Sequence, residues 1–133
     1  MGVLVNLAKD GYRIDTSKDN VVIVDVFQTI RGGRALDVTG FGPDVIKAGH
    51  VIIVETASGN HKPMPLATND TVYGALPAGH TYAGILIASI LKTKAEAGIM
   101  VRGTVNPAAA PFPMTTILAA VKTALPLIDF RQD

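Results

Sequence analysis

The stretch "HTYAGILIASILKTKAEAGIMVRGTVNP", His80 to Pro107, contains two apolar runs with a short charged segment between them. The runs over residues 81–91 and 97–105 are typical of β-strands, and the charges of "KTKAEA" indicate a connection that faces solvent. Neither run alternates apolar and polar residues, which predicts burial on both faces, as in a closed barrel or at a subunit contact. We therefore expect a mainly β body, either a small β-barrel or a sandwich.

Five side chains of these two runs are predicted to lie in the core or at a subunit contact. They are Ile85, Ile87, Ile99, Val101 and Arg102. Arg102 stands among apolar neighbours in "GIMVRGTV", so we expect it to pair with a carboxylate across such a contact.

Residues 1–20 are predicted to form an N-terminal arm, and residues 21–133 a single β-rich domain. The arm opens with the apolar "VLVNL", which a polar, turn-rich segment over residues 11–20 separates from the body. The β-branched "VVIVDVF", Val21 to Phe27, then predicts the first strand of the body. A glycine-rich excursion follows, with a short strand expected over residues 35–38.

Two further strands are expected around a hairpin turn. Residues 50–56 read as a strand, and "ASGN" at residues 57–60 supplies side chains that tolerate a positive φ. Pro63 and Pro65 cannot donate ladder hydrogen bonds, so the returning "HKPMPLA" is expected at a sheet edge or in irregular structure.

The C-terminal region predicts a helix over about residues 114–125. Ile117, Leu118, Val121, Ala124 and Leu125 recur at helical spacing, and Pro126 ends the pattern. The tail that follows is expected to add a strand or to pack Leu127, Ile128 and Phe130 against the body.

The composition excludes several classes of protein. The 133 residues are 48% hydrophobic and 17% charged, which indicates one folded domain. The net charge is +1, and the basic residues do not cluster in the sequence as they do in proteins that bind nucleic acid, so no nucleic-acid partner is expected. The longest apolar run, Gly84 to Leu91, falls far short of the roughly 20 residues that span a bilayer, and the first residues lack the pattern of a secretion signal. No membrane association is predicted.

The residue pattern offers no catalytic set, so we expect neither catalytic residues nor a cofactor or metal. The sequence has no cysteine, and His50, His61 and His80 match no ligand spacing. Because His50 and His80 each follow a glycine before a strand, we expect them in capping or turn hydrogen bonds. The two glycines of "GFGPDV" precede a proline and not the helix that a dinucleotide site needs. The protein is interpreted as a non-enzyme built to form an interface.

Residues 46–107 resemble the head decoration proteins of tailed bacteriophages, the lambda type, and the related head fibre proteins. The resemblance rests on "IKAGHVIIVETASGNHKPMP", "GHTYAGILIASIL" and "AGIMVRGTVNP". These carry an Ala-Gly strand at Ala48 and Gly49, a Lys-Pro return at Lys62 and Pro63, an Ala-Gly-Ile-Leu strand from Ala83 to Leu86, and a Gly-x-Val motif within Gly103 to Asn106.

The resemblance implies a β-rich structural protein, a homotrimer on the outside of the capsid, made in the cytoplasm of a bacterial host. Its partner would be the major capsid protein, and its role to stabilise the shell. The arm residues Val3, Leu4, Val5 and Leu7 would contact neighbouring shell subunits by adding a strand to them. Two alternatives stay open: another virion adaptor of the tail, baseplate or fibre attachment, and a small cytoplasmic ligand-binding β-domain.

Overall fold

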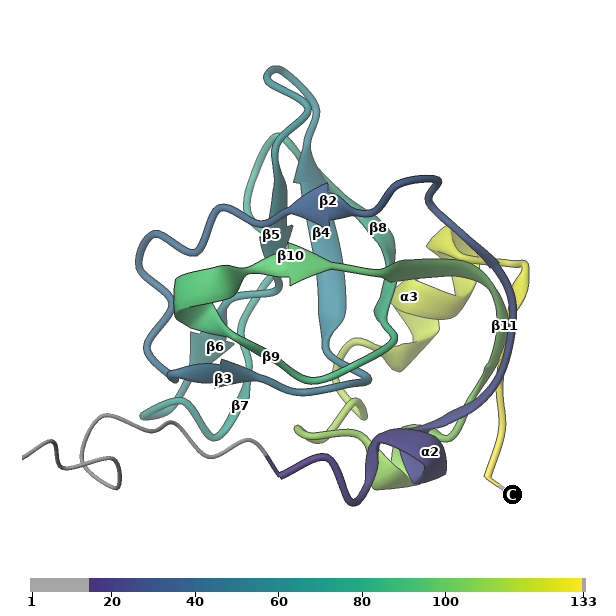
Figure 1. Ribbon diagram of the computed structural model, residues 1–133. Coiled ribbons are helices and arrows are strands. Elements are labelled where there is room, and N and C mark those ends of the chain that lie inside the picture. Colours follow the sequence, from purple (N-terminus) through teal and green to yellow (C-terminus); the bar gives the residue numbers. More distant parts are fainter. Residues whose placement is uncertain (1–14, 133) are drawn as a thin grey trace, which may run out of the picture.

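The computed structural model describes residues 15–132, and within them the fold is mainly β with one helix near the C-terminus, which confirms the predicted fold class (Figure 1). The arm residues Val3, Leu4, Val5 and Leu7 lie outside the described residues.

One sheet of six strands forms the centre of the body. Its strands are β1 (Ile23–Thr29), β4 (Val51–Glu55), β5 (His61–Pro63), β8 (His80–Leu86), β11 (Ile99–Val105) and β12 (Ile128–Phe130). The order is β1-β11-β8-β4-β5, with every pair antiparallel. β12 runs parallel to β11, beside the C-terminal half of that strand. The prediction that "HKPMPLA" lies at a sheet edge or in irregular structure is therefore confirmed, because β5 is the last strand of the order and Met64 and Pro65 lie outside any strand.

Three short strand pairs complete the β structure. They are β2 (Arg34–Ala35) with β10 (Glu96–Ala97), β3 (Val45–Ile46) with β9 (Ile90–Leu91), and β6 (Leu66–Ala67) with β7 (Val72–Tyr73). A parallel bridge between Leu36 and His61 joins the chain after β2 to the edge strand β5. In Figure 1, β2 and β10 pass in front of β4 and β5. Together with the bridge to β5, they give the body a barrel-like shape.

The continuous apolar runs are explained by two cores, one on each face of the sheet. Ile85 of β8 and Met100 of β11 lie in the first core, whereas their chain neighbours Leu86 and Ile99 lie in the second. All four side chains are fully buried. Because successive residues of a strand point to opposite faces, a strand covered on both sides needs apolar residues at every position. The expectation of two buried faces is confirmed at these positions.

Helix α3 (Leu118–Ala124) begins four residues later than the predicted start at Met114. Met114 to Ile117 form a turn instead, in which the N–H groups of Ile117 and Leu118 both donate to the carbonyl of Met114. Of the predicted apolar face, Ile117, Val121 and Leu125 are buried in the first core and Leu118 packs against it half-buried, but Ala124 is exposed. The expected strand in the tail is β12, but Leu127 before it is 62% exposed and does not pack against the body.

The chain before β1 differs from the expected strand over residues 21–27. Asp19–Val22 form the single-turn helix α2, and the strand runs instead from Ile23 to Thr29. The N–H groups of Val21 and Val22 donate to the carbonyl of Lys18, which holds this turn. Two 3-10 turns complete the chain: η1 (Lys92–Lys94) in the charged connection and η2 (Pro107–Ala109) after β11.

Candidate functional site

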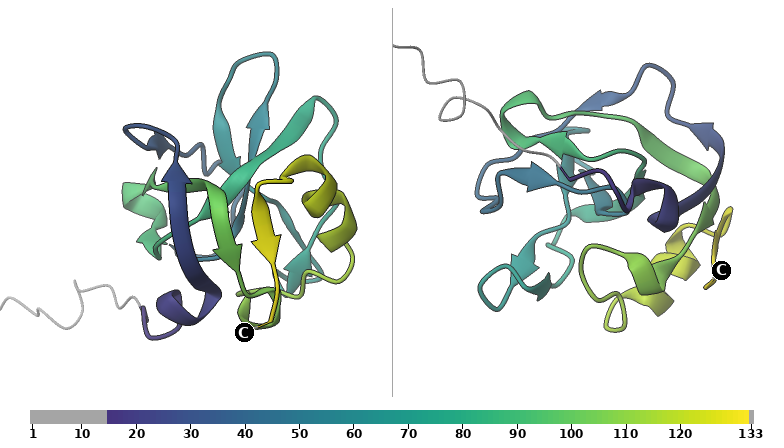
Figure 2. Two further views of the ribbon diagram at one scale, coloured as in Figure 1. Left: turned by 90° about the vertical axis from the view of Figure 1, so that its right-hand side faces the viewer. Right: turned by 60° about the horizontal axis from the view of Figure 1, so that its bottom comes forward.

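The most unusual surface of the described chain is the edge strand β1. Val24, Val26 and Phe27 are 39%, 42% and 66% exposed, which makes them three of the five exposed large hydrophobic residues among residues 15–132. Figure 2 shows β1, β11 and β12 side by side, with β1 at the outer edge. β1 also exposes Asp25 and Gln28, but it has no lysine or proline, and an edge strand with exposed apolar side chains is a template for pairing with another chain. We call Val24, Val26 and Phe27 the β1 patch.

The register between β1 and β11 shifts three times, and Gly103 lies at the centre of this irregular pairing. Gly103 pairs with Val26 and has a φ of +155°. A Cβ atom at this position would meet the backbone carbonyl oxygen of Asp25 and the sulfur of Met100. Glycine therefore lets β1 approach β11 closely enough to hold the β1 patch at the sheet edge.

The residues predicted for the core or a subunit contact fall into two groups. Ile85 and Ile99 are fully buried within the single chain. Ile87 and Val101 are half-buried, and Arg102 is exposed. Within residues 15–132, Arg102 has no carboxylate at ion-pair distance. The pairing predicted for Arg102 across a subunit contact stays a prediction.

Sequence reasoning missed an aromatic cluster around His50, which is fully buried at the start of β4. The rings of Phe41, Tyr73 and Phe112 lie with their centroids 5.3, 5.1 and 5.7 Å from the imidazole, all in edge arrangements. The Tyr73 hydroxyl accepts a hydrogen bond from the N–H of Val51, and burial raises the pKa of that hydroxyl. The cluster therefore joins segments that are distant in sequence, so no spacing pattern in the sequence could have predicted it.

The expected turn hydrogen bonds are made by the backbone N–H groups of both histidines, since His50 donates to Lys47 and His80 to Pro77, but only the His80 side chain bonds within its turn. Its Nδ1–H donates to the carbonyl of Ala78 at 2.9 Å, within the turn before β8. His50 instead uses Nε2 to donate to the carbonyl of Met64, 14 residues away. Burial lowers the pKa of His50 to about 4, although the bond to Met64 opposes this shift.

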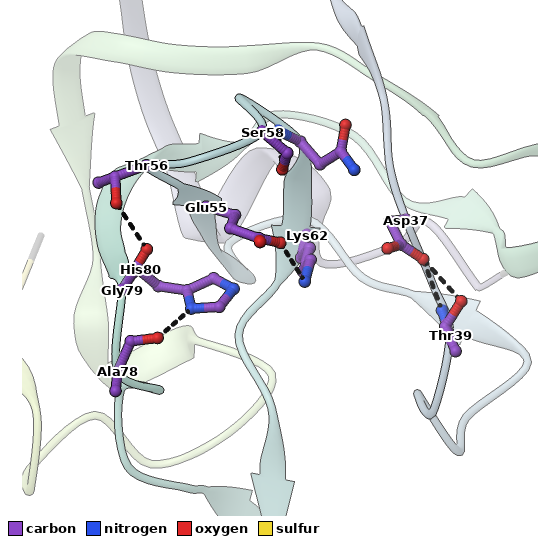
Figure 3. A network of polar contacts seen from close by, with 10 residues as sticks. Asp37, Thr39, Glu55, Thr56, Ser58, Lys62, Ala78, Gly79 and His80 are labelled. Carbon is purple, nitrogen blue, oxygen red and sulfur yellow. Dashed lines mark hydrogen bonds and ion pairs between the residues drawn. The ribbon is translucent and has the colours of Figure 1, made fainter.

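A polar network surrounds His80 at the hairpin end of β4 and β5 (Figure 3). Lys62 forms an ion pair with Glu55 at 3.0 Å, which holds the pKa of the Glu55 carboxyl below its usual value. Asp37 accepts hydrogen bonds from the N–H and the hydroxyl of Thr39. A cleft of about 290 Å³ lies beside this network, with Asp37, Lys62 and His80 in its wall.

A second cleft, of about 370 Å³, lies beside α2. Val22, Val45 and Phe112 contribute apolar surface to its wall. Charged side chains of both signs also line it: Lys18, Lys47, Asp15 and Asp19. Both clefts lie near the lower end of the range typical of small-molecule sites, which is roughly 300–1,000 Å³.

Residues 15–132 hold no group of three histidine or carboxylate side chains that could bind a metal ion. In the same part of the chain, no helix has the length and apolarity needed to cross a membrane.

Comparison with known proteins gave no family model, no curated protein and no solved structure that matches this chain.

Proposed function

We propose that this protein is a structural component of a bacteriophage particle, a capsid decoration or head fibre protein that binds the outside of the shell and stabilises it. Its partner is the major capsid protein, and the protein acts as a homotrimer without enzymatic activity. The proposal begins from the resemblance of residues 46–107 to the lambda-type decoration proteins.

The observation that best supports an interface function is the β1 patch. Exposing Val24, Val26 and Phe27 to water is unfavourable, by roughly 25 cal/mol for each Å² of apolar surface that a partner could cover. The open edge of β1 adds backbone donors and acceptors that a neighbouring strand can satisfy. Under the proposed function, a neighbouring protomer or a shell subunit covers the β1 patch.

The apolar segment of Val3, Leu4, Val5 and Leu7 provides the second contact in this proposal. Each protomer of a trimer would bring one such arm to the shell. Three linked contacts of modest strength bind far more tightly than one, because the second and third form at high effective concentration.

Quantitative mass spectrometry of purified particles tests the proposal directly. We expect this chain and the major capsid protein at a ratio near one to one, as decoration of the whole surface requires. A few copies per particle would instead assign it to a fibre base or to the tail. Absence from the particles would overturn the proposal.

The two clefts favour a second candidate, a small ligand-binding β-domain of the bacterial cytoplasm. A ligand at 100 times its Kd stabilises a protein by about 2.7 kcal/mol, which a thermal-shift screen detects. A reproducible shift with a small molecule, lost on Lys62→Ala or Phe112→Ala, would support this candidate. With no shift across a broad metabolite panel, the candidate fails.

A further inference from the structure

His50 joins four segments: Phe41 and Phe112 lie in turns, Tyr73 lies in the two-residue strand β7, and Met64 directly follows β5. Three of them place aromatic rings against its imidazole, at Phe41, Tyr73 and Phe112. The fourth accepts its hydrogen bond through the carbonyl of Met64. The imidazole is the only group that all four segments share in these contacts.

The hydrogen bond to Met64 fixes the neutral tautomer of His50. A carbonyl only accepts, so the proton resides on Nε2, and Nδ1 carries a bare lone pair. Nδ1 is buried and has no hydrogen-bond partner among the described residues. A second proton would therefore enter at Nδ1, where nothing accepts it.

No charged group offsets the cost of that proton. The perturbations of the His50 pKa are burial, which lowers it, and the Met64 bond, which raises it. The groups packed against the ring are the apolar Phe41 and Phe112 and the hydroxyl-bearing Tyr73. Tyr73 is the only titratable one, and its raised pKa keeps it neutral. Charge at His50 is thus uncompensated on every side.

The N–H of Met64 donates to Val51 of β4, so Met64 belongs to the sheet. The segments of Phe41, Tyr73 and Phe112 can separate from His50 more easily than the strands of the sheet can separate from one another. β6 and β7 are two-residue strands, and the chains around Phe41 and Phe112 are turns. Tyr73 lies in the first core and Phe41 in the second. By contrast with their short pairings, β4 pairs with β8 and β11 with β1 over five register positions each. Local opening with few broken contacts is cheaper than global unfolding.

We propose that His50 is an acid-sensitive switch: its protonation opens the segments that carry Phe41, Tyr73 and Phe112, while Met64 and the sheet of β4, β8 and β11 stay folded. Both clefts would change shape, since Phe41 lines one and Phe112 the other. This proposal does not depend on binding to a shell.

Hydrogen exchange of the full chain between pH 7 and pH 4, followed by mass spectrometry and corrected for the intrinsic exchange rate, tests the switch. The 2.5-unit gap between a pKa of 6.5 and one of about 4 predicts that the opening equilibrium rises about 100-fold over this range. The rise should appear in peptides that contain Phe41, Tyr73 or Phe112, and not in β11.

Two variants separate His50 from the other titrating groups. His50→Phe keeps an aromatic ring without a proton site, and its exchange should lose the excess pH dependence. The double variant His61→Gln with His80→Gln leaves His50 as the only imidazole and should behave like the parent. Unchanged pH dependence in His50→Phe, or equal loss of protection in β11, would overturn the proposal.

NMR titration of the parent protein gives a check that needs no variant. We expect the His50 ring to stay neutral down to about pH 5 in the native spectrum. A ring that titrates near pH 6.5 with every native resonance retained would also overturn the switch.

Discussion

Asp19 accepts two hydrogen bonds from Ser89, 70 residues further along the chain: one from the backbone N–H at 2.9 Å and one from the hydroxyl at 2.7 Å. The hydroxyl oxygen of Ser89 in turn accepts from the N–H of Ala48 at 3.0 Å. This small network ties α2 to the break between β8 and β9. It therefore fixes the point at which the N-terminal chain joins the body.

Replacing Asp19 with alanine should destabilise the body by about 1–3 kcal/mol, because two hydrogen bonds to a charged acceptor are lost and the Ser89 N–H is left without a partner. Urea denaturation measures the change. Asp44→Ala is the matched control, since Asp44 is exposed and its side chain makes no hydrogen bond or ion pair in the described chain. Equal stability of the two variants would show that the Asp19 network contributes nothing.

A charge buried in one of the two cores should lower the free energy of unfolding far more than the loss of the Asp19 hydrogen bonds. Ile85 is fully buried in β8, and an unpaired carboxylate there costs several kcal/mol, which is comparable to the whole stability of a small domain. We expect Ile85→Asp to be unfolded by circular dichroism. Thr81→Asp on the exposed part of the same strand should fold normally. A folded Ile85→Asp protein would contradict the described packing of β8.

Much of the central sheet could be predicted from local sequence. The β-branched runs predicted β4, β8 and β11, and their lack of alternation predicted cover on both faces. Pro63 predicted the edge position of β5. These features depend on residues that are close together in the chain, so a single sequence is enough to predict them.

The features that sequence reasoning missed depend on contacts between distant residues. The Asp19–Ser89 network and the cluster around His50 bring together positions that no short window contains. The β1 patch is hidden for another reason: "VVIVDVF" reads as a strand whether its side chains are buried or exposed, because hydrophobicity alone does not reveal a missing neighbour. The late start of α3 is consistent with Thr115 and Thr116, whose β-branched side chains lower helix propensity.

The β1 patch should matter for association and not for folding. Phe27 is 66% exposed, so Phe27→Ser removes little buried surface and should change the free energy of unfolding by less than about 0.5 kcal/mol. Light scattering after size exclusion should show a smaller oligomer, and co-sedimentation with shells should weaken. Leu127→Ser is the control, because Leu127 is 62% exposed but precedes β12, on the opposite side of β11 from β1. Equal binding by both variants would remove the β1 patch from the interface.

The N-terminal boundary gives the sharpest separation of shell binding from stability. Deleting residues 1–14 removes Val3, Leu4, Val5 and Leu7 but keeps Asp19, so the body should retain its melting temperature while binding to shells is lost.

Deleting residues 1–20 also removes the Asp19 contacts with Ser89. This longer deletion should lower the melting temperature by several degrees, since 1 kcal/mol corresponds to roughly 2–8 °C in domains of this size range. Val5→Asp in the full chain should reproduce the binding defect without truncation. If the protein lacking residues 1–14 still binds shells at parent affinity, the arm has no part in the contact; if it aggregates, the arm belongs to the body.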